Sequence, residues 1–198
     1  MITHFIHLIK TFYSIYYRNL RRFPLCQIET YVHPKLTIGK NTKIKSGCYI
    51  SDSVKMIGDY VYIGNGAKIL NCSEIGNYTS ISHDVKIGLD NHSLYTFSTS
   101  PWVCKMETKS PCIIENDVLI SANVVIMSGI KLGNGCVIGA NSFVNCDIPP
   151  YAVAVGSPAR IVKFRFNEEK IEQLENSEWW KNDPSNISED FINKIQTL

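Results

Sequence analysis

Aliphatic residues recur along the chain every six positions, and this is the strongest pattern in the sequence. The first series begins at Ile38 and slips once, by one residue, between Ile50 and Ile57. Both series together comprise Ile38, Ile44, Ile50, Ile57, Ile63, Ile69, Ile75, Ile81, Ile87, Ile114, Ile120, Ile126, Leu132, Ile138 and Val144. Neither the helical period of 3.6 residues nor the alternation of an ordinary strand produces a six-residue interval.

A second series of mostly smaller residues lies two positions before many of these aliphatic residues. It comprises Thr42, Cys48, Val61, Ala67, Thr79, Val85, Val118, Val124, Cys136 and Ser142. Short strands that point one large and one small residue inward, joined by corners rich in Gly and Asn, explain both series. We therefore predict a solenoid in which three six-residue segments complete each coil, with Cys48 and Cys136 as core residues.

This repeat resembles the left-handed parallel β-helix of the hexapeptide-repeat acyltransferases over about residues 36–165. The left-handed sense is implied by the resemblance alone, because crossover connections are generally right-handed. We expect a mainly β protein with four parts. These are an N-terminal amphipathic helix at 1–24, a left-handed β-helix at 25–165, an extruded loop at 88–113 within it, and a C-terminal helical tail at 166–198.

The loop carries the candidate chemistry. Long loops on rigid scaffolds often carry function, and the repeat alone does not require this one. Its segment IGLDNHSLYTFSTSPW, which begins at Ile87, resembles the extruded loop of the xenobiotic and polysaccharide O-acetyltransferase branch. There, Gly-x-x-Asn-His is followed by Ser-Thr-x-Pro. The resemblance implies that His92 is the general base for an acceptor hydroxyl, a role that suits a neutral imidazole, with Asn91 beside it at the site.

Other residues near the loop are candidates for binding the acceptor. Aromatic faces suit sugar rings, so Tyr95, Phe97 and Trp102 are expected to line the acceptor site. His83 lies at a predicted corner of the solenoid and is a further candidate. The group that orients His92 is left open between a nearby Asp and a loop carbonyl. No acyl-enzyme is required, so no cysteine is assigned as a nucleophile.

The second block of repeats resembles the family's donor-binding end. The resemblance implies that acetyl-CoA lies along small residues, with basic side chains meeting its phosphates. The residues implied are Ala122, Ala140, Pro158, Ala159, Arg160 and Lys163. The family usually has Trp and then Ile-Gly after Asp-Val, where this chain has Leu119–Ser121.

Composition narrows the possible partners. The 198 residues carry a net charge of +2, which is too weak a positive field for binding duplex nucleic acid. The seven cysteines form no CxxC motif, and no apolar run reaches 18 residues. We therefore expect reduced thiols, a cytoplasmic protein, no spanning helix and no metal site.

Two interpretations of the N-terminal segment stay open. Apolar residues at helical spacing over residues 2–22 are accompanied by Lys10, Arg18, Arg21 and Arg22. The helix either caps the first coil or packs in a trimer, or it contacts a membrane surface. Near the other end, Trp179 and Trp180 are expected to dock the tail on the solenoid or on a neighbouring subunit.

The sequence therefore predicts an acetyl-CoA-dependent O-acetyltransferase that acts on a sugar hydroxyl in the synthesis of a bacterial surface polysaccharide (capsule or O-antigen). The family implies a homotrimer with active sites between subunits. The expected location is the cytoplasm, at the inner face of the membrane if the N-terminal helix contacts lipid. One alternative is O-acetylation of an antibiotic of the streptogramin or chloramphenicol type. Another is a non-catalytic scaffold. A metal hydratase would need three converging histidines, and the repeat region offers only His83 and His92.

Overall fold

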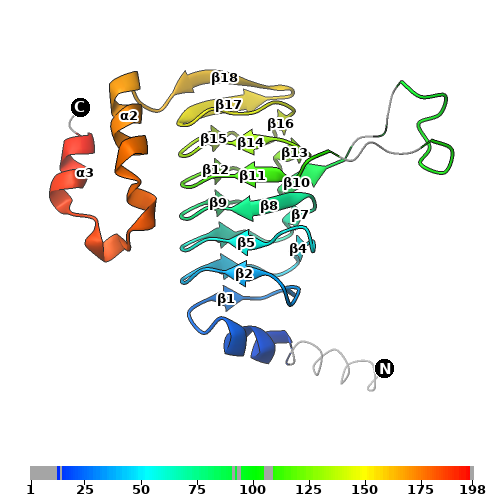
Figure 1. Cartoon of the computed structure of the whole chain (residues 1–198), viewed down its shortest axis with the longest axis horizontal. Helices are drawn as coiled ribbons and strands as arrows, with labels where there is room; N and C mark the ends of the chain where they lie inside the picture. Colours follow the sequence, from blue (N-terminus) through cyan, green and yellow to red (C-terminus); the bar gives the residue numbers. More distant parts are fainter. Residues whose placement is uncertain (1–12, 14, 91, 93–94, 105–108, 197–198) are drawn as a thin grey trace.

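The chain forms a parallel β-solenoid with three faces, as the six-residue repeat predicts (Figure 1). The structure, a computed structural model, describes residues 13, 15–90, 92, 95–104 and 109–196. Its short strands stack into about seven coils. The expected class, a mainly β protein with the left-handed parallel β-helix of the hexapeptide repeat, is confirmed.

The strands form three sheets, here named A, B and C. Sheet A contains β1 (Gln27–Ile28), β3 (Lys43–Ile44), β6 (Tyr62–Ile63), β9 (Ser80–Ile81), β12 (Leu119–Ile120), β15 (Val137–Ile138), β17 (Ala152–Gly156) and β18 (Ala159–Phe164). Sheet B contains β2 (Thr37–Ile38), β5 (Met56–Ile57), β8 (Cys72–Ile75), β11 (Cys112–Ile114) and β14 (Lys131–Leu132). Sheet C contains β4 (Tyr49–Ile50), β7 (Lys68–Ile69), β10 (Lys86–Leu89), β13 (Val125–Met127) and β16 (Phe143–Val144). All of the pairings are parallel except the antiparallel β17–β18 hairpin.

The core is a set of aliphatic ladders, one for each sheet. In sheet A, Ile63 is in register with Ile81, Ile81 with Ile120, and Ile120 with Ile138. Every aliphatic position of the repeat is buried, and so is every position of the smaller series, Cys48 and Cys136 included. Full burial of one such aliphatic side chain stabilises the fold by roughly 1.5–3 kcal/mol. The predicted core is therefore confirmed residue by residue.

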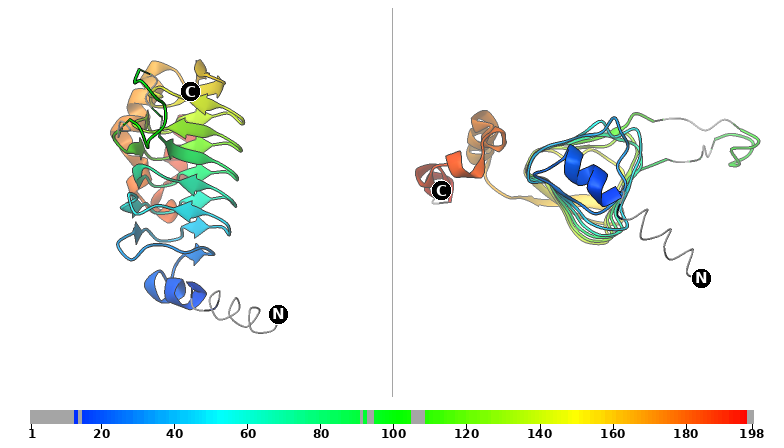
Figure 2. Two further views of the ribbon diagram at one scale, coloured as in Figure 1. Left: turned by 90° about the vertical axis from the view of Figure 1, so that its right-hand side faces the viewer. Right: turned by 90° about the horizontal axis from the view of Figure 1, so that it is seen from below.

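Three corners join the sheets, and each has a different role. At the A/C corner the chain turns tightly from sheet A to sheet C, as between β9 and β10. At the C/B corner the loop leaves after β10 and returns at β11. At the B/A corner the C-terminal helices pack against the solenoid, opposite the loop in two views at right angles (Figures 1 and 2).

A short N-terminal helix, residues 15–22, covers the first coil at the base of the solenoid (Figure 2). Asn19 is buried and donates from Nδ2 to the carbonyl oxygens of Ile28, at 3.3 Å, and Thr30, at 2.8 Å. Arg22 donates to the carbonyl of Pro34 at 2.9 Å. These bonds satisfy carbonyl groups of the open first coil, so this helix acts as a cap.

The C-terminal segment comprises α2 (Glu168–Ser177), the 3₁₀ turns η1 (Trp179–Lys181) and η2 (Pro184–Asn186), and α3 (Glu189–Gln196). It docks on the chain's own solenoid at the B/A corner. Trp180 is buried, and the ring of Trp179 lies 5.1 Å from that of Tyr78. Asp183 accepts from Lys40 at 2.8 Å and from the Tyr60 hydroxyl at 2.6 Å. Of the two docking partners that the sequence left open, the solenoid is the one observed.

Candidate active site

Polar side chains hold the two ends of the extruded loop together at the C/B corner. Asn71 donates from Nδ2 to the carbonyl of Lys109, at 3.1 Å, and to the hydroxyl of Ser128, at 3.2 Å. The Ser128 hydroxyl in turn donates to Asp90 at 2.7 Å. These residues tie the outgoing end at Asp90 to the returning end at Lys109. Sequence reasoning did not single out Asn71 or Ser128, because their meeting depends on the coil register.

Gly88 makes this arrangement possible. Its φ is +77°, and a Cβ built there would lie 2.3 Å from the backbone oxygen of Asn71 and 2.5 Å from its nitrogen. Only glycine accepts both the left-handed conformation and so close an approach of the neighbouring coil. The backbone of Asn71 also accepts from the Cys112 amide at 2.9 Å, where β11 resumes the solenoid. The residues before and after the loop therefore both pack against the backbone of Asn71.

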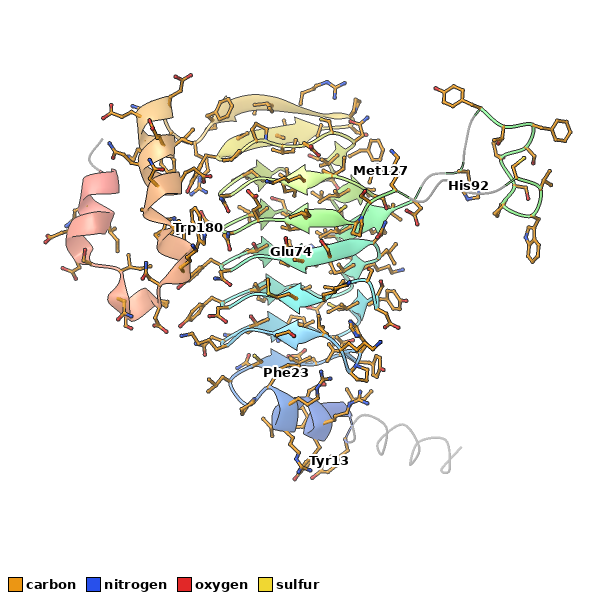
Figure 3. The ribbon with its side chains drawn as sticks, in the orientation of Figure 1. Tyr13, Phe23, Glu74, His92, Met127 and Trp180 are labelled. Atoms are coloured by element: carbon orange, nitrogen blue, oxygen red, sulfur yellow. The ribbon has the colours of Figure 1, made fainter. Side chains whose placement is uncertain are left out.

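His92 follows this base and lies beyond the edge of the solenoid (Figure 3). Its Nδ1 is hydrogen-bonded to the carbonyl oxygen of Thr99, at 2.5 Å. A carbonyl oxygen only accepts, so Nδ1 carries the proton and the neutral ring keeps its lone pair on Nε2. That tautomer is the one a general base needs. Of the two kinds of orienting group that the sequence left open, a loop carbonyl is observed, whereas Asp90 bonds to Ser128 instead.

The loop presents its aromatic side chains to solvent. Tyr95, Phe97 and Trp102 are 99%, 97% and 96% exposed in the single chain. Serine hydroxyls fold the tip locally: Ser98 accepts from the Ser100 amide at 3.1 Å. Three large aromatic residues so fully exposed are costly in water, which indicates that they contact something outside this chain. Asn91, the other predicted catalytic residue, lies outside the described residues.

The predicted donor residues Ala122 and Ala140 share the A/C corner with His83. Each lies two residues after a strand of sheet A, and those strands are in direct register. The Asn123 amide donates to the carbonyl of His83 at 3.2 Å, and the Asn141 amide to that of Ala122 at 3.0 Å. These three residues, here called the corner column, thus occupy successive coils. The small side chains of Ala122 and Ala140 leave little to project from this edge of the solenoid.

The C-terminal donor candidates lie on the β17–β18 hairpin, one coil above the corner column. Pro158 is in the hairpin turn, and Arg160 and Lys163 are exposed on β18. Arg160 donates to the carbonyl of Ala159 at 2.8 Å. The side chain of Ala159 itself is buried in the core, so its contribution to a surface site is limited to its backbone.

A single chain does not bring His92 together with the corner column. Sheet C separates the two: the chain runs from His83 through β10 (Lys86–Leu89) before the loop leaves. The four residues of β10 alone span roughly 13 Å at about 3.3 Å per residue. The general-base candidate and the donor-binding candidates therefore lie on different corners of the same solenoid.

The buried cysteines are unsuited to nucleophilic chemistry. Burial raises the pKa of Cys72 and of Cys136 to about 12, so both are neutral thiols near pH 7. Among the described residues, no three His, Cys, Asp or Glu side chains come close enough to hold a metal ion. No helix in the described part of the chain has the length and hydrophobicity to cross a membrane.

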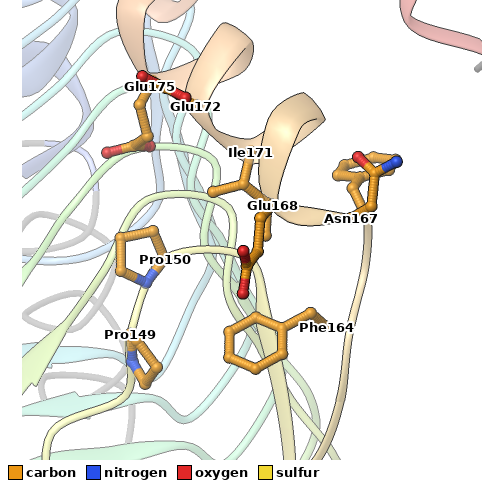
Figure 4. A pocket seen from close by; sticks show the side chains of 9 residues that line it. Pro149, Pro150, Phe164, Asn167, Glu168, Ile171, Glu172 and Glu175 are labelled. Atoms are coloured by element: carbon orange, nitrogen blue, oxygen red, sulfur yellow. The ribbon is translucent and has the colours of Figure 1, made fainter.

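A separate cavity of about 460 Å³ lies between α2 and the top of the solenoid (Figure 4). Pro149, Pro150, Phe164 and Ile171 are among the residues that wall it, and three glutamates of α2 also line it. None of the described site candidates is among its lining residues. Carboxylates repel the phosphates of a coenzyme, so this cavity is not a suitable donor site.

Comparison with known proteins agrees with the fold. Residues 111–146 match the family model described as bacterial transferase hexapeptide (six repeats). A probable macrolide acetyltransferase from Lysinibacillus sphaericus is 33% identical over 149 residues, which cover 71% of this chain and 80% of that protein. A chloramphenicol acetyltransferase from Klebsiella aerogenes is 32% identical over 126 residues, 63% of this chain and 58% of that protein.

A solved structure supports the fold. The N-acyltransferase AntD from Bacillus cereus, in complex with dTDP and 3-hydroxybutyryl-CoA, superposes with a TM-score of 0.62 at 24% identity. The superposition covers 79% of this chain and 85% of that one. The six-residue repeat, the three-sided solenoid and the extent of the match to the Lysinibacillus sphaericus protein lead to one conclusion. The chain belongs to the hexapeptide-repeat acetyltransferases and is an acyltransferase.

Proposed function

We propose that the protein transfers an acetyl group from acetyl-CoA to a hydroxyl of a sugar-containing acceptor, with His92 as the general base. One observation carries this proposal: the Thr99 carbonyl fixes the proton of His92 on Nδ1 and leaves Nε2 free to accept another. The ring is on a loop whose exposed aromatic residues suit the faces of a sugar. We further propose that the acceptor is a bacterial surface polysaccharide or its lipid-linked precursor, modified at the cytoplasmic side of the membrane.

His92 moves one proton in each direction during the reaction. Nε2 takes the proton of the acceptor hydroxyl while that oxygen attacks the thioester carbonyl carbon. The Thr99 carbonyl stabilises the imidazolium that forms, since its oxygen faces the Nδ1 proton. The C–S bond then breaks, and His92 returns the proton to the leaving thiolate. The products are the acetyl ester and free CoA, and no group on the protein is acylated.

We propose a homotrimer in which each active site combines the loop of one subunit with the corner column of the next. Two observations support this arrangement. His92 and the corner column lie on different corners of one chain, and Tyr95, Phe97 and Trp102 have no cover within it. Arg160 and Lys163 of the hairpin are exposed near the same edge and are proposed to meet the phosphates of acetyl-CoA.

Co-expression of two inactive variants tests the shared site. We expect His92→Ala and Ala140→Trp each to remove activity, because one loses the base and the other blocks the corner column. Mixed trimers regain activity if each site takes His92 from one subunit and Ala140 from its neighbour. Mixed assemblies that stay inactive would place both residues of a site in the same chain and contradict the proposal.

A second candidate acceptor is an antibiotic hydroxyl, which the similarity to macrolide and chloramphenicol acetyltransferases favours. The chemistry at His92 is the same for both acceptors. A CoA-release assay with acetyl-CoA and a panel of sugars, nucleotide sugars, macrolides and chloramphenicol separates them. Release that depends on a sugar supports the first proposal, and release that depends only on an antibiotic supports the second. If no acceptor gives release and acetyl-CoA does not bind, a scaffold replaces both.

A further inference from the structure

The N-terminal helix presents an apolar face that no described part of the chain covers. Tyr13, Tyr16, Tyr17 and Leu20 are 60%, 50%, 56% and 45% exposed. Their spacing of three and four residues places them on one face of the helix. The polar Asn19 is buried against the first coil on the other side. The usual orientation of an amphipathic helix is thus inverted: its polar residue faces the protein and its aromatic stripe faces outward.

This stripe lies at the base of the solenoid, where Figure 3 shows Tyr13 and Phe23. In the segment that follows the helix, Leu25 and Tyr31 are also exposed, at 65% and 50%. The rings of Tyr13 and Tyr17 pack at 4.8 Å, and the guanidinium of Arg18 lies 4.8 Å from the ring of Tyr31. The base therefore combines exposed aromatic rings with arginine side chains over one end of the molecule.

The positive charge of this end of the molecule favours an anionic partner. Residues 1–28 include Lys10, Arg18, Arg21 and Arg22 and contain no Asp or Glu, and the carboxylate of Glu29, which follows them, is paired with Lys45. A second copy meeting the first base to base would bring the arginines of both helices together, and like charges repel. An anionic lipid surface instead complements the arginines, while tyrosine rings suit the boundary between headgroups and acyl chains. In the sequence before Tyr13, Ile2, Ile6 and Ile9 continue the same helical spacing.

We propose that the base of the solenoid, formed by the outer face of the N-terminal helix with Leu25 and Tyr31, docks on an anionic membrane surface. The inner face of the same helix caps the first coil, so one short element performs both tasks. The docking surface is distinct from the loop and the corner column and does not depend on the reaction proposed for them.

Co-sedimentation of the full-length protein with lipid vesicles tests this proposal. We expect binding to vesicles of phosphatidylcholine with about one-third phosphatidylserine, and little binding to phosphatidylcholine alone. Raising the salt to 0.5 M weakens the binding, because surface electrostatics are screened. The double variant Arg18→Gln/Arg21→Gln binds roughly 25-fold more weakly, at about fivefold for each basic residue.

Matched variants separate the docking surface from general effects. Tyr13→Ser/Tyr17→Ser is expected to lose binding, whereas Tyr49→Ser/Tyr62→Ser, which changes exposed tyrosines on the solenoid wall, retains it. Lys68→Gln/Lys86→Gln removes the same charge as the double arginine variant and also retains binding. Equal binding to neutral and anionic vesicles would overturn the proposal. Equal losses of vesicle binding in the wall variants would also overturn it. A change in the oligomeric state of Tyr13→Ser/Tyr17→Ser without lipid would assign the stripe to a subunit interface and overturn it as well.

Discussion

Replacement of Gly88 by alanine tests how the solenoid positions the extruded loop. The φ of Gly88 is +77°, and an added Cβ would meet the backbone of Asn71 at 2.3–2.6 Å. Gly47 is a matched control. Its φ is +74°, but a Cβ there would meet only Gly66, at an ordinary 3.7 Å. Both variants therefore share the backbone penalty, and only Gly88→Ala forces two coils apart.

The two penalties have different expected sizes. Alanine in the left-handed conformation costs about 1–2 kcal/mol, which is the whole expected effect of Gly47→Ala. Overpacking against backbone adds about 1–3 kcal/mol for Gly88→Ala, for a total of about 2–5 kcal/mol. At roughly 2–4 °C per kcal/mol for a chain of this size, Tm falls by roughly 2–8 °C for the control and 4–20 °C for Gly88→Ala.

The activity of the two variants separates positioning from stability. Asn71 contacts both ends of the loop through Lys109 and Ser128, so its displacement moves His92. A displacement of about 1 Å at a reacting group costs on the order of 100-fold in rate. At a temperature where both variants are folded, we expect the kcat/KM of Gly88→Ala to fall by about 100-fold. We expect Gly47→Ala to keep the wild-type kcat/KM. Equal Tm and equal kcat/KM in the two variants would refute this account of the loop base.

Three further predictions concern the core, the thiols and the tail. Ile120→Ala should lower the free energy of unfolding by about 2–5 kcal/mol in urea titrations, while Leu119→Ala, its exposed neighbour on β12, changes it by about 0.5 kcal/mol or less. Iodoacetamide at pH 7.5 should modify exposed Cys146 rapidly and Cys136, with its pKa of about 12, only on unfolding; rapid native labelling of Cys136 would contradict its burial. The pKa of Asp183 is held well below its ordinary 3.8 by Lys40 and Tyr60, so these contacts should keep the tail docked above pH 4 and weaken only at lower pH. The tryptophan fluorescence of the tail should therefore stay constant down to pH 4 during an acid titration of the wild type. In Asp183→Asn, the part of the fluorescence change below pH 4 that comes from protonation of Asp183 should be absent.

The six-residue repeat predicted the ladders of the core because it records burial directly, whereas core residues outside the repeat, such as Val54, Cys72 and Cys112, were not predicted. An inward residue such as Ile120 stacks on the equivalent residues of the coils above and below it. The spacing of these residues therefore predicts where each strand lies and which sheet it joins. The small residues preceding each ladder position followed from the same geometry. Asn71 and Ser128 carried no such signal, because they meet across coils only once the loop has interrupted the register.

The orientation of His92 had an equally local cause that the sequence does not record. Its partner is a backbone carbonyl, and every residue of the loop has one, so the identity of Thr99 gives no indication. The N-terminal helix illustrates a different limit. Its apolar spacing left open whether the stripe faces the first coil, a neighbouring subunit or a membrane. In the structure Tyr16 is half-exposed, and Asn19 occupies the inward position and satisfies carbonyl groups of the first coil. Hydrogen-bonding needs at an open solenoid end outweigh the burial of one tyrosine.

The steady-state rate of CoA release in His92→Ala, with the acceptor identified in the panel, tests the central claim most directly. His83→Ala is the matched control, since it removes the exposed histidine of the corner column. We predict that His92→Ala lowers kcat by about 10²–10⁴-fold, as for a lost general base, with the KM for acetyl-CoA nearly unchanged. His83→Ala should raise the KM for the acceptor and keep kcat within about tenfold. A wild-type kcat in His92→Ala would remove this histidine, and the Thr99 contact with it, from the mechanism.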